Sequence, residues 1–350
     1  MKTSWMPEDI IAADDSLDTI NHMACQQGWG DGLPVVPPTI ERVVRMMATV
    51  DLAPEDIVAE IFPKRGIATV EKLAANAVMA GCMPSYFPVV IAAAEAMAAP
   101  EFNLFRINCT TNSVGVMLII NGPVRHEIGV NCGYGLFGPG WRANATIGRA
   151  ARLIQLNIGG SVPGSVSKST HGQPGRFSMC IGENEEVSPW EPMHVERGLQ
   201  REDNAVTVFP AMGTTNVSDL WHTDAKDILG NMLSLVDCSA THTLRYRSGQ
   251  ILMVMNPDHA KLMGDAGLTK QDVRQLMHEV TSHIDVSRFV PDVQEKFRDE
   301  GLVDNGTMTL APDASFFDVM VAGGEGGLHA TMVPGFSHCM PVTKKVIKRS

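Results

Sequence analysis

The stretch HGQPGRFSMCIGENEEVSPWEPMHVER (171–197) holds a dense group of chemically active side chains. Its repeated Gly and Pro residues exclude a long regular helix or a central strand, and they predict a loop that aims side chains inward. Thiol, imidazole and carboxylate groups stand close together in it, as they do in metal sites and acid/base sites. A solvated acidic loop is the simpler alternative. The side chains concerned are His171, Cys180, Glu183, Glu185, Glu186, Glu191, His194 and Glu196.

The central run of acids and amides in this stretch has no apolar residue, so the hydrophobic effect cannot draw it inward. Carboxylates are costly to bury unless a cation or hydrogen-bond donors compensate for the lost water. We therefore predict one catalytic pocket, formed by Glu183, Glu186, His194, Cys132 and Cys180. The donors available for compensation are Arg142, Arg176 and Arg197.

A divalent metal is the other way to compensate the acids, and its ligands would be His171, Glu183, Glu186 and His194. The thiols Cys82, Cys132 and Cys180 stand in turn-like segments that contain glycines. Three thiolates in such loops could hold an iron–sulfur cluster. A metal-free site with Cys as the nucleophile and His or Glu as the base is a further alternative. The cofactor therefore stays open at this point.

Helical and strand-like segments alternate around the acidic loop. Apolar periodicity and capping residues predict helices at 16–27, 69–79, 87–98, 143–156, 269–281 and 291–299, and another that starts at Ile40. Strands are expected at 103–109, 114–120, 205–211, 251–255 and 317–321. This order indicates an α/β fold of open mixed sheets with flanking helices.

A sequence of strand, Asn, Pro, His and helix occurs twice, near 117–128 and 251–263. It suggests two related α/β halves, although short motifs also match by chance. The expected division is an arm at 1–66, a first half at 67–200 and a second half at 201–350. The turns at the strand ends should line one main cavity. These turns are 110–112, 121–126, 214–216, 256–259 and 323–329.

Two glycine-rich segments, 131–140 and 323–329, leave backbone amides free to approach a ligand. Arg142 follows the first segment and suits a substrate carboxylate, while the second is typical of a site at a strand end. A plain tight turn is the alternative for the second segment. The expected substrate-binding residues are Asn112, Arg142, Asn144, Asn216 and His329.

Composition excludes several classes of partner. The formal charge of −11 disfavours nucleic acid and anionic membranes, and no apolar run is long enough to span a bilayer. No signal-peptide pattern opens the chain, so a cytoplasmic location is expected. The seven cysteines include no Cys-x-x-Cys pair, and Cys25, Cys109 and Cys238 suit a core. Met-rich and Gly-rich apolar segments favour a homo-oligomer.

Four long motifs resemble an uncharacterised bacterial family that is loosely associated with UGSC-motif selenoproteins. They are GWGDGLPVVPPT (28–39), ATVEKLAANAVMAGCMP (68–84), NCGYGLFGPGWRANATIGRA (131–150) and ENEEVSPWEPMHVERG (183–198). Gly30 stands where the family has Thr, and Trp141 stands where it has Asn. The chain contains no Cys-Gly-Ser-Cys, so redox chemistry of the UGSC kind does not carry over. The resemblance implies no established activity.

Three functions fit these observations. The first is an enzyme that acts on a small polar organic molecule by metal-assisted or acid/base chemistry, as a lyase or hydrolase. The second is a thiol-based oxidoreductase that works with a second protein subunit. The third is a non-catalytic binding subunit.

Overall fold

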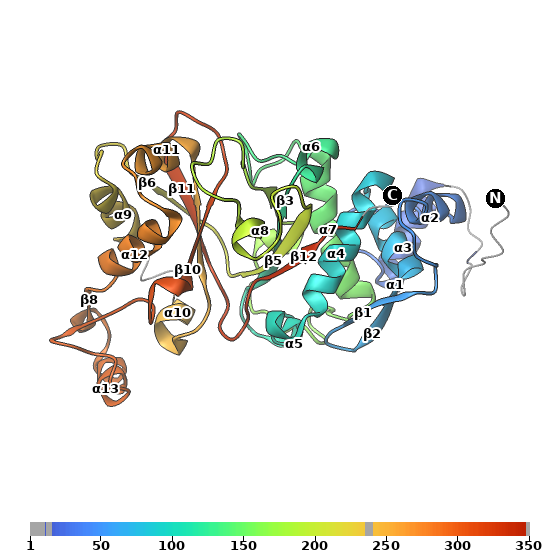
Figure 1. Ribbon diagram of the computed structural model, residues 1–350. Coiled ribbons are helices and arrows are strands. Elements are labelled where there is room, and N and C mark those ends of the chain that lie inside the picture. The colour runs from blue at the N-terminus through green and yellow to red at the C-terminus, as the bar shows by residue number, and fades with distance from the viewer. Residues whose placement is uncertain (1–10, 12–15, 235–240, 348–350) are drawn as a thin grey trace.

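Two four-stranded sheets with helices around them organise the computed structural model (Figure 1). The structure describes residue 11 and residues 16–234 and 241–347. The predicted α/β fold with mixed sheets is confirmed. Cys238, expected in the core, lies outside the described residues.

The first sheet has the order β12-β5-β3-β4. Its strands are β3 (Gly115–Asn121), β4 (Cys180–Gly182), β5 (Ala205–Ala211) and β12 (Val342–Lys345). β3 pairs with β4 in parallel and with β5 antiparallel. All residues of β3 and β5 are buried, because helices cover one face of the two strands and residues of the second sheet pack against the other.

The second sheet has the order β10-β7-β11-β6. Its strands are β6 (Thr215–Ser218), β7 (Ile251–Met255), β10 (Phe317–Val321) and β11 (His329–Pro334). β7 pairs with β10 in parallel and with β11 antiparallel, so it takes the place that β3 has in the first sheet. The two sheets therefore have the same strand order and the same pattern of strand directions.

The two halves exchange their outer strands. β6 follows β5 in the chain but pairs with β11 of the second sheet, while β12 follows β11 but pairs with β5 of the first (Figure 1). The two connections cross where Met212 N donates to Pro334 O at 2.9 Å and Phe336 N donates to Pro210 O at 3.0 Å. The predicted boundary at residue 200 is therefore wrong for the sheets, because β5 and β12 complete the first sheet.

The helices agree with most of the predicted segments. Around the first sheet they are α1 (Leu17–Gln27), α2 (Ile40–Met47), α3 (Val70–Ala80), α4 (Phe87–Ala98), α5 (Leu104–Cys109), α6 (Val124–Glu127), α7 (Arg142–Asn157) and α8 (Met193–Glu196). Around the second they are α9 (Ala225–Leu233), α10 (Thr241–Tyr246), α11 (Pro257–Asp265), α12 (Lys270–Val280) and α13 (Pro291–Asp299). Two small antiparallel sheets pair β1 (Ile57–Ile61) with β2 (Gly66–Thr69), and β8 (Ile284–Asp285) with β9 (Thr307–Met308). Short 3₁₀ turns are η1 (Pro84–Tyr86), η2 (Pro100–Phe102), η3 (Pro174–Arg176), η5 (Val286–Arg288) and η6 (Ala314–Phe316).

Capping residues explain why the helix boundaries could be predicted. Thr39, Thr69 and Thr269 each accept a backbone N–H of the first turn at α2, α3 and α12. Gly28 and Gly81 end α1 and α3 with φ of 71° and 91°, a left-handed conformation that glycine adopts without strain.

The predicted strand at 103–109 is wrong, because Leu104–Cys109 is helix α5. Asn103, with φ of 54°, accepts the N–H of Arg106 and starts the helix. This local cap decides the conformation against the β-branched and aromatic residues that follow. No helix in the described part of the chain has the length and apolar character that a bilayer span requires.

Candidate functional site

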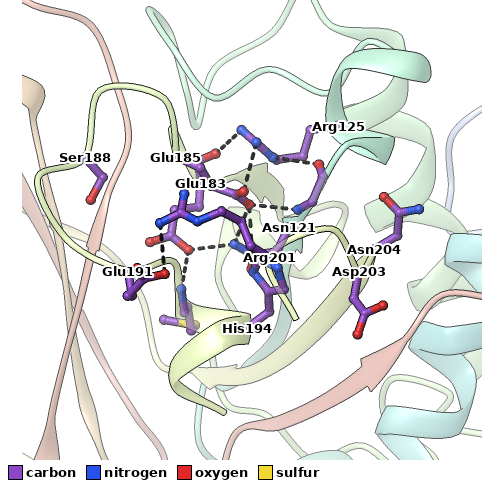
Figure 2. A network of polar contacts seen from close by, with 12 residues as sticks. Asn121, Arg125, Glu183, Glu185, Ser188, Glu191, His194, Arg201, Asp203 and Asn204 are labelled. Atoms are coloured by element: carbon purple, nitrogen blue, oxygen red, sulfur yellow. Dashed lines mark hydrogen bonds and ion pairs between the residues drawn. The ribbon is translucent and has the colours of Figure 1, made fainter. Parts of the chain in front are cut away.

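The acidic loop after β4 carries a network of polar contacts, and its residues range from buried to exposed (Figure 2). Glu183 is fully buried and Glu185 nearly so. Asn121 Nδ2, at the end of β3, donates to Glu183 Oε2 at 2.6 Å and to Glu185 Oε1 at 2.9 Å. The backbone N–H of Met193 donates to Glu183 Oε2 at 2.8 Å. The alternative of a solvated surface loop is therefore wrong for these two acids.

Arg125 of α6 supplies the main positive charge of the network. Its side chain is 2% exposed, and its Nη2 lies 3.1 Å from Glu185 and 2.9 Å from Glu186. Lys270 of α12 adds a second cation, 3.8 Å from Glu183. The compensating cations are therefore Arg125 and Lys270, and the predicted donors bind elsewhere. Arg142 donates to Gly81 O, Arg176 to Ser167 Oγ and Arg197 to Asp318.

The network connects segments that are distant in the chain, namely the end of β3, α6, the acidic loop and α12. Burial raises the pKa of Glu183, and Lys270 offsets only part of this effect. His194 is fully buried and neither of its ring nitrogens has a hydrogen-bond partner. None of the cavities described below is lined by Glu183, Glu186 or His194. Glu183 and His194 are enclosed by the protein, whereas the Glu186 side chain is 52% exposed, and none of these cavities brings the three residues together.

The network predicts how stability changes with acid. Burial of Glu186 is opposed by hydrogen bonds from Arg125 and His126, which lower its pKa to about 2. A depressed folded-state pKa stabilises the fold above the unfolded pKa, and this stabilisation is lost as pH falls through the folded value. We expect Glu186→Gln to flatten the fall in melting temperature between pH 4.5, the ordinary pKa of a Glu side chain, and about 2, its pKa in the folded chain. An unchanged melting profile in this pH range would contradict the ion-pair assignment.

The thiols are poor candidates for a nucleophile. Burial raises the pKa of Cys180 and of Cys132, although Arg125 lies close enough to Cys132 to oppose the shift. Burial also raises the pKa of Cys82 to about 12. Because the thiolate is the reactive form, these environments hold the side chains in the unreactive thiol form.

The predicted metal ligands do not form a joint site. Among residues 11, 16–234 and 241–347, no group of three or more His, Cys, Asp and Glu side chains could hold a metal ion. Glu183 and Glu186 bind protein cations in the network, whereas His171 faces the cavity of about 580 Å³ described next. Cys82, Cys132 and Cys180, all described residues, likewise do not come together as a metal-binding group.

A cavity of about 580 Å³ lies between α7 and the loop at 163–177. Two arginines line it, Arg152 from α7 and Arg176 from η3. Arg149, one turn before Arg152, binds Asp31 through two hydrogen bonds of 2.8 Å and so neutralises the one carboxylate in the cavity wall. Gln173 Nε2 donates to Ser113 O and Ala211 O, which ties the loop to the ends of β3 and β5.

Neither Arg152 nor Arg176 forms an ion pair with a carboxylate of the described residues. Arg152 makes two long contacts with Ser161, at 3.5 Å and 3.3 Å, and Arg176 makes one hydrogen bond of 3.0 Å with Ser167 Oγ. A guanidinium has five N–H donors, so most of these donors are unused. Burial, with the nearby charge of Arg176, lowers the pKa of Arg152 to about 10. Burial lowers the pKa of Arg176 as well.

Polar groups complete the wall of this cavity. Ser169 Oγ is buried and has no hydrogen-bond partner among the described residues. Ser167, two positions earlier, is buried as well. His171 is exposed at the rim. The cavity thus combines two unneutralised cations, hydroxyl donors and an imidazole, which is an arrangement for binding an anion and moving a proton near it.

The five predicted substrate-binding residues do not meet in one place. Arg142 donates to Gly81 O at 3.1 Å and 2.9 Å and so caps the end of α3. Asn144 is buried and bonds the backbone of Asn131 and Cys180, which anchors the glycine-rich segment. Asn112 contacts His242 in a second cavity of about 530 Å³.

Asn216 contacts His329, which lines a third cavity of about 380 Å³ together with Asn256. The strand-end turns are therefore distributed over separate cavities, and the prediction that they line one main cavity is wrong. His171 is the one predicted site residue that lines the 580 Å³ cavity. Arg152 was missed, although a signal existed: the segment around it, ARLIQLN (151–157), offers no acidic partner.

Searches of protein-family models and of curated proteins find no match for this chain.

Proposed function

We propose that the protein is an enzyme that acts on a small organic anion by acid/base chemistry, as a lyase or hydrolase. One observation carries the proposal: the buried Arg152 and the half-buried Arg176 line one cavity, and neither has a carboxylate partner among the described residues. Buried charges are normally paired, because an unpaired charge loses its hydration without compensation. A bound anion would restore the missing partner.

The proposed roles follow from the positions of the side chains. Arg152 and Arg176 bind the anionic group, and the hydroxyls of Ser167 and Ser169 donate to it. His171 stands at the rim, where the remainder of the substrate emerges, and exchanges a proton with it. The thiol-based alternative is weaker, because burial raises the pKa of both Cys132 and Cys180. The motif GWGDGLPVVPPT, which carries the family resemblance, contributes Gly30 and Asp31 to the wall.

The test measures binding and stability together. Acetate, succinate and inorganic phosphate are titrated against the full chain, and melting temperature is recorded. A ligand at about 100 times its Kd stabilises the native state by about 2.7 kcal/mol. We expect at least one of these anions to stabilise the native chain, and we expect Arg152→Met and Arg176→Met to abolish this effect. Arg142→Met is the matched control, because Arg142 lies outside the cavity.

Arginine variants also separate a binding role from a structural role. If Arg152 and Arg176 hold a ligand, their replacement by Met should leave the unliganded stability unchanged or raise it, since a buried like-charge pair is removed. Equal anion binding by native and variant chains would refute the proposal. With a substrate in hand, His171→Ala is expected to lower turnover about 10²–10⁴-fold while anion affinity is kept.

A further inference from the structure

A second, much smaller space lies next to the two arginines, between them and residues of β3 and α7. It measures about 10 Å³, and Arg152 and Arg176 line both this space and the 580 Å³ cavity. About 10–15 Å³ is room for one water-sized probe. This space can hold one water molecule and is too small for a ligand group, so an anion bound to Arg152 and Arg176 would lie on the side of the 580 Å³ cavity.

Glycines form much of the wall around this space. Gly115, Gly148 and Gly175 line it together with Val116 and Gln155. A Cβ atom at Gly115 would lie 3.3 Å from Arg176 Cγ, and one at Gly148 would lie 2.5 Å from Ser178 Oγ. Side chains at these positions would crowd the arginines or the loop. The atoms that these Cβ atoms would meet belong to residues 173–180, so the missing side chains let this segment, with Arg176, pack closely against β3 and α7.

The local charge at this space is about two positive units. Arg152 and Arg176 carry one each, and Asp31 in the cavity wall is neutralised by its ion pair with Arg149 behind it. A carboxylate would leave one of the two positive charges without compensation. A phosphate monoester carries about −1.5 to −2 at pH 7 and offers three acceptor oxygens, which matches two guanidinium forks.

We propose that the ligand of this site is a phosphate monoester whose phosphoryl group binds between Arg152 and Arg176, with its organic part in the 580 Å³ cavity. This inference rests on the proposed function, because it specifies the anion of the same site. The charge of two units favours a dianion over a single carboxylate, and the close packing at the glycines holds the segment with Arg176 against α7, which carries Arg152. His171 at the rim then faces the organic part of the ester.

The experiment compares three probes by isothermal titration against the full chain: methyl phosphate, dimethyl phosphate and acetate. Methyl phosphate is a dianion above its second pKa of about 6, whereas the other two are monoanions at neutral pH. We expect methyl phosphate to bind at least tenfold more tightly than either monoanion at pH 8. We also expect its affinity to fall as pH is lowered from 8 to 5, while Arg176→Met removes binding and Arg142→Met does not.

The pH test needs a control for the imidazole of His171 in the cavity wall. His171 lines the cavity, and His171→Gln removes its contribution, so the pH dependence that remains reports the second ionisation of the phosphate. Acetate or dimethyl phosphate binding as tightly as methyl phosphate would overturn the phosphate inference and leave the anion proposal standing. No binding of any probe, with arginine variants behaving as the native chain, would overturn both.

Discussion

Replacement of Arg125 by Met is expected to lower the free energy of unfolding by about 3–5 kcal/mol, because removing one partner of a buried ion pair leaves the other charges uncompensated. Arg125 is 2% exposed and contacts Glu185, Glu186 and the carbonyl oxygen of Glu183. Its loss leaves the Glu185 carboxylate with hydrogen bonds from Asn121 and Gly122 alone. Urea unfolding followed by circular dichroism measures the change.

A surface pair in the same region provides the control. Arg201 contacts Glu191 at 2.9 Å, and both side chains are more than half exposed. Exposed pairs contribute about 0.2–1 kcal/mol, so Arg201→Met should change stability little. Equal losses for the two variants would show that the buried network is not the stabilising feature we describe. The acid double variant Glu185→Gln and Glu186→Gln, combined with Arg125→Met, should recover part of the loss.

Replacement of Gly122 by Ala is expected to cost about 2–5 kcal/mol, the sum of left-handed backbone strain and overpacking. Gly122 has φ of 82°, and a Cβ atom there would lie 2.1 Å from the backbone oxygen of Asp203. A backbone atom cannot rotate away as a side chain does, so the segments would have to separate. The N–H of Gly122 also donates to Glu185 at 2.7 Å, and this bond would be disturbed.

Gly129 offers a matched control for this substitution. It has φ of 69°, and no atom lies within 4 Å of the position of an added Cβ. Gly129→Ala therefore tests the backbone strain alone and should cost about 1–2 kcal/mol. Thermal and urea unfolding of both variants give the difference. A Gly122→Ala variant as stable as Gly129→Ala would rule out the close contact with Asp203.

Much of the fold could be predicted because its signals are local. Continuous apolar runs predicted β3, β5, β7 and β10, and Thr and Gly caps predicted the ends of several helices. The exchange of β6 and β12 could not be predicted. Both strands are four residues long and contain no fully buried residue. They therefore have no apolar pattern from which the sheet they join could be predicted.

The candidate site was only partly predictable for a related reason. The burial of Glu183 and Glu185 needed compensation, as expected, but Arg125 and Lys270 are distant in sequence and only the fold brings them near. For Arg152 and Arg176 the informative feature is a missing partner. A missing partner is visible only when all the neighbours in space are known, and the sequence around each arginine shows only the neighbours in the chain.

The exchanged strands also determine the order in which the protein can be completed during its synthesis. β12 lies after the whole second sheet in chain order, yet it forms the outer strand beside β5. The ribosome therefore releases the first half with the backbone groups along one side of β5 still unpaired. Such an open edge attracts other strands, so nascent chains are exposed to mispairing until the second half has emerged. Neither half can finish folding before the other has been made.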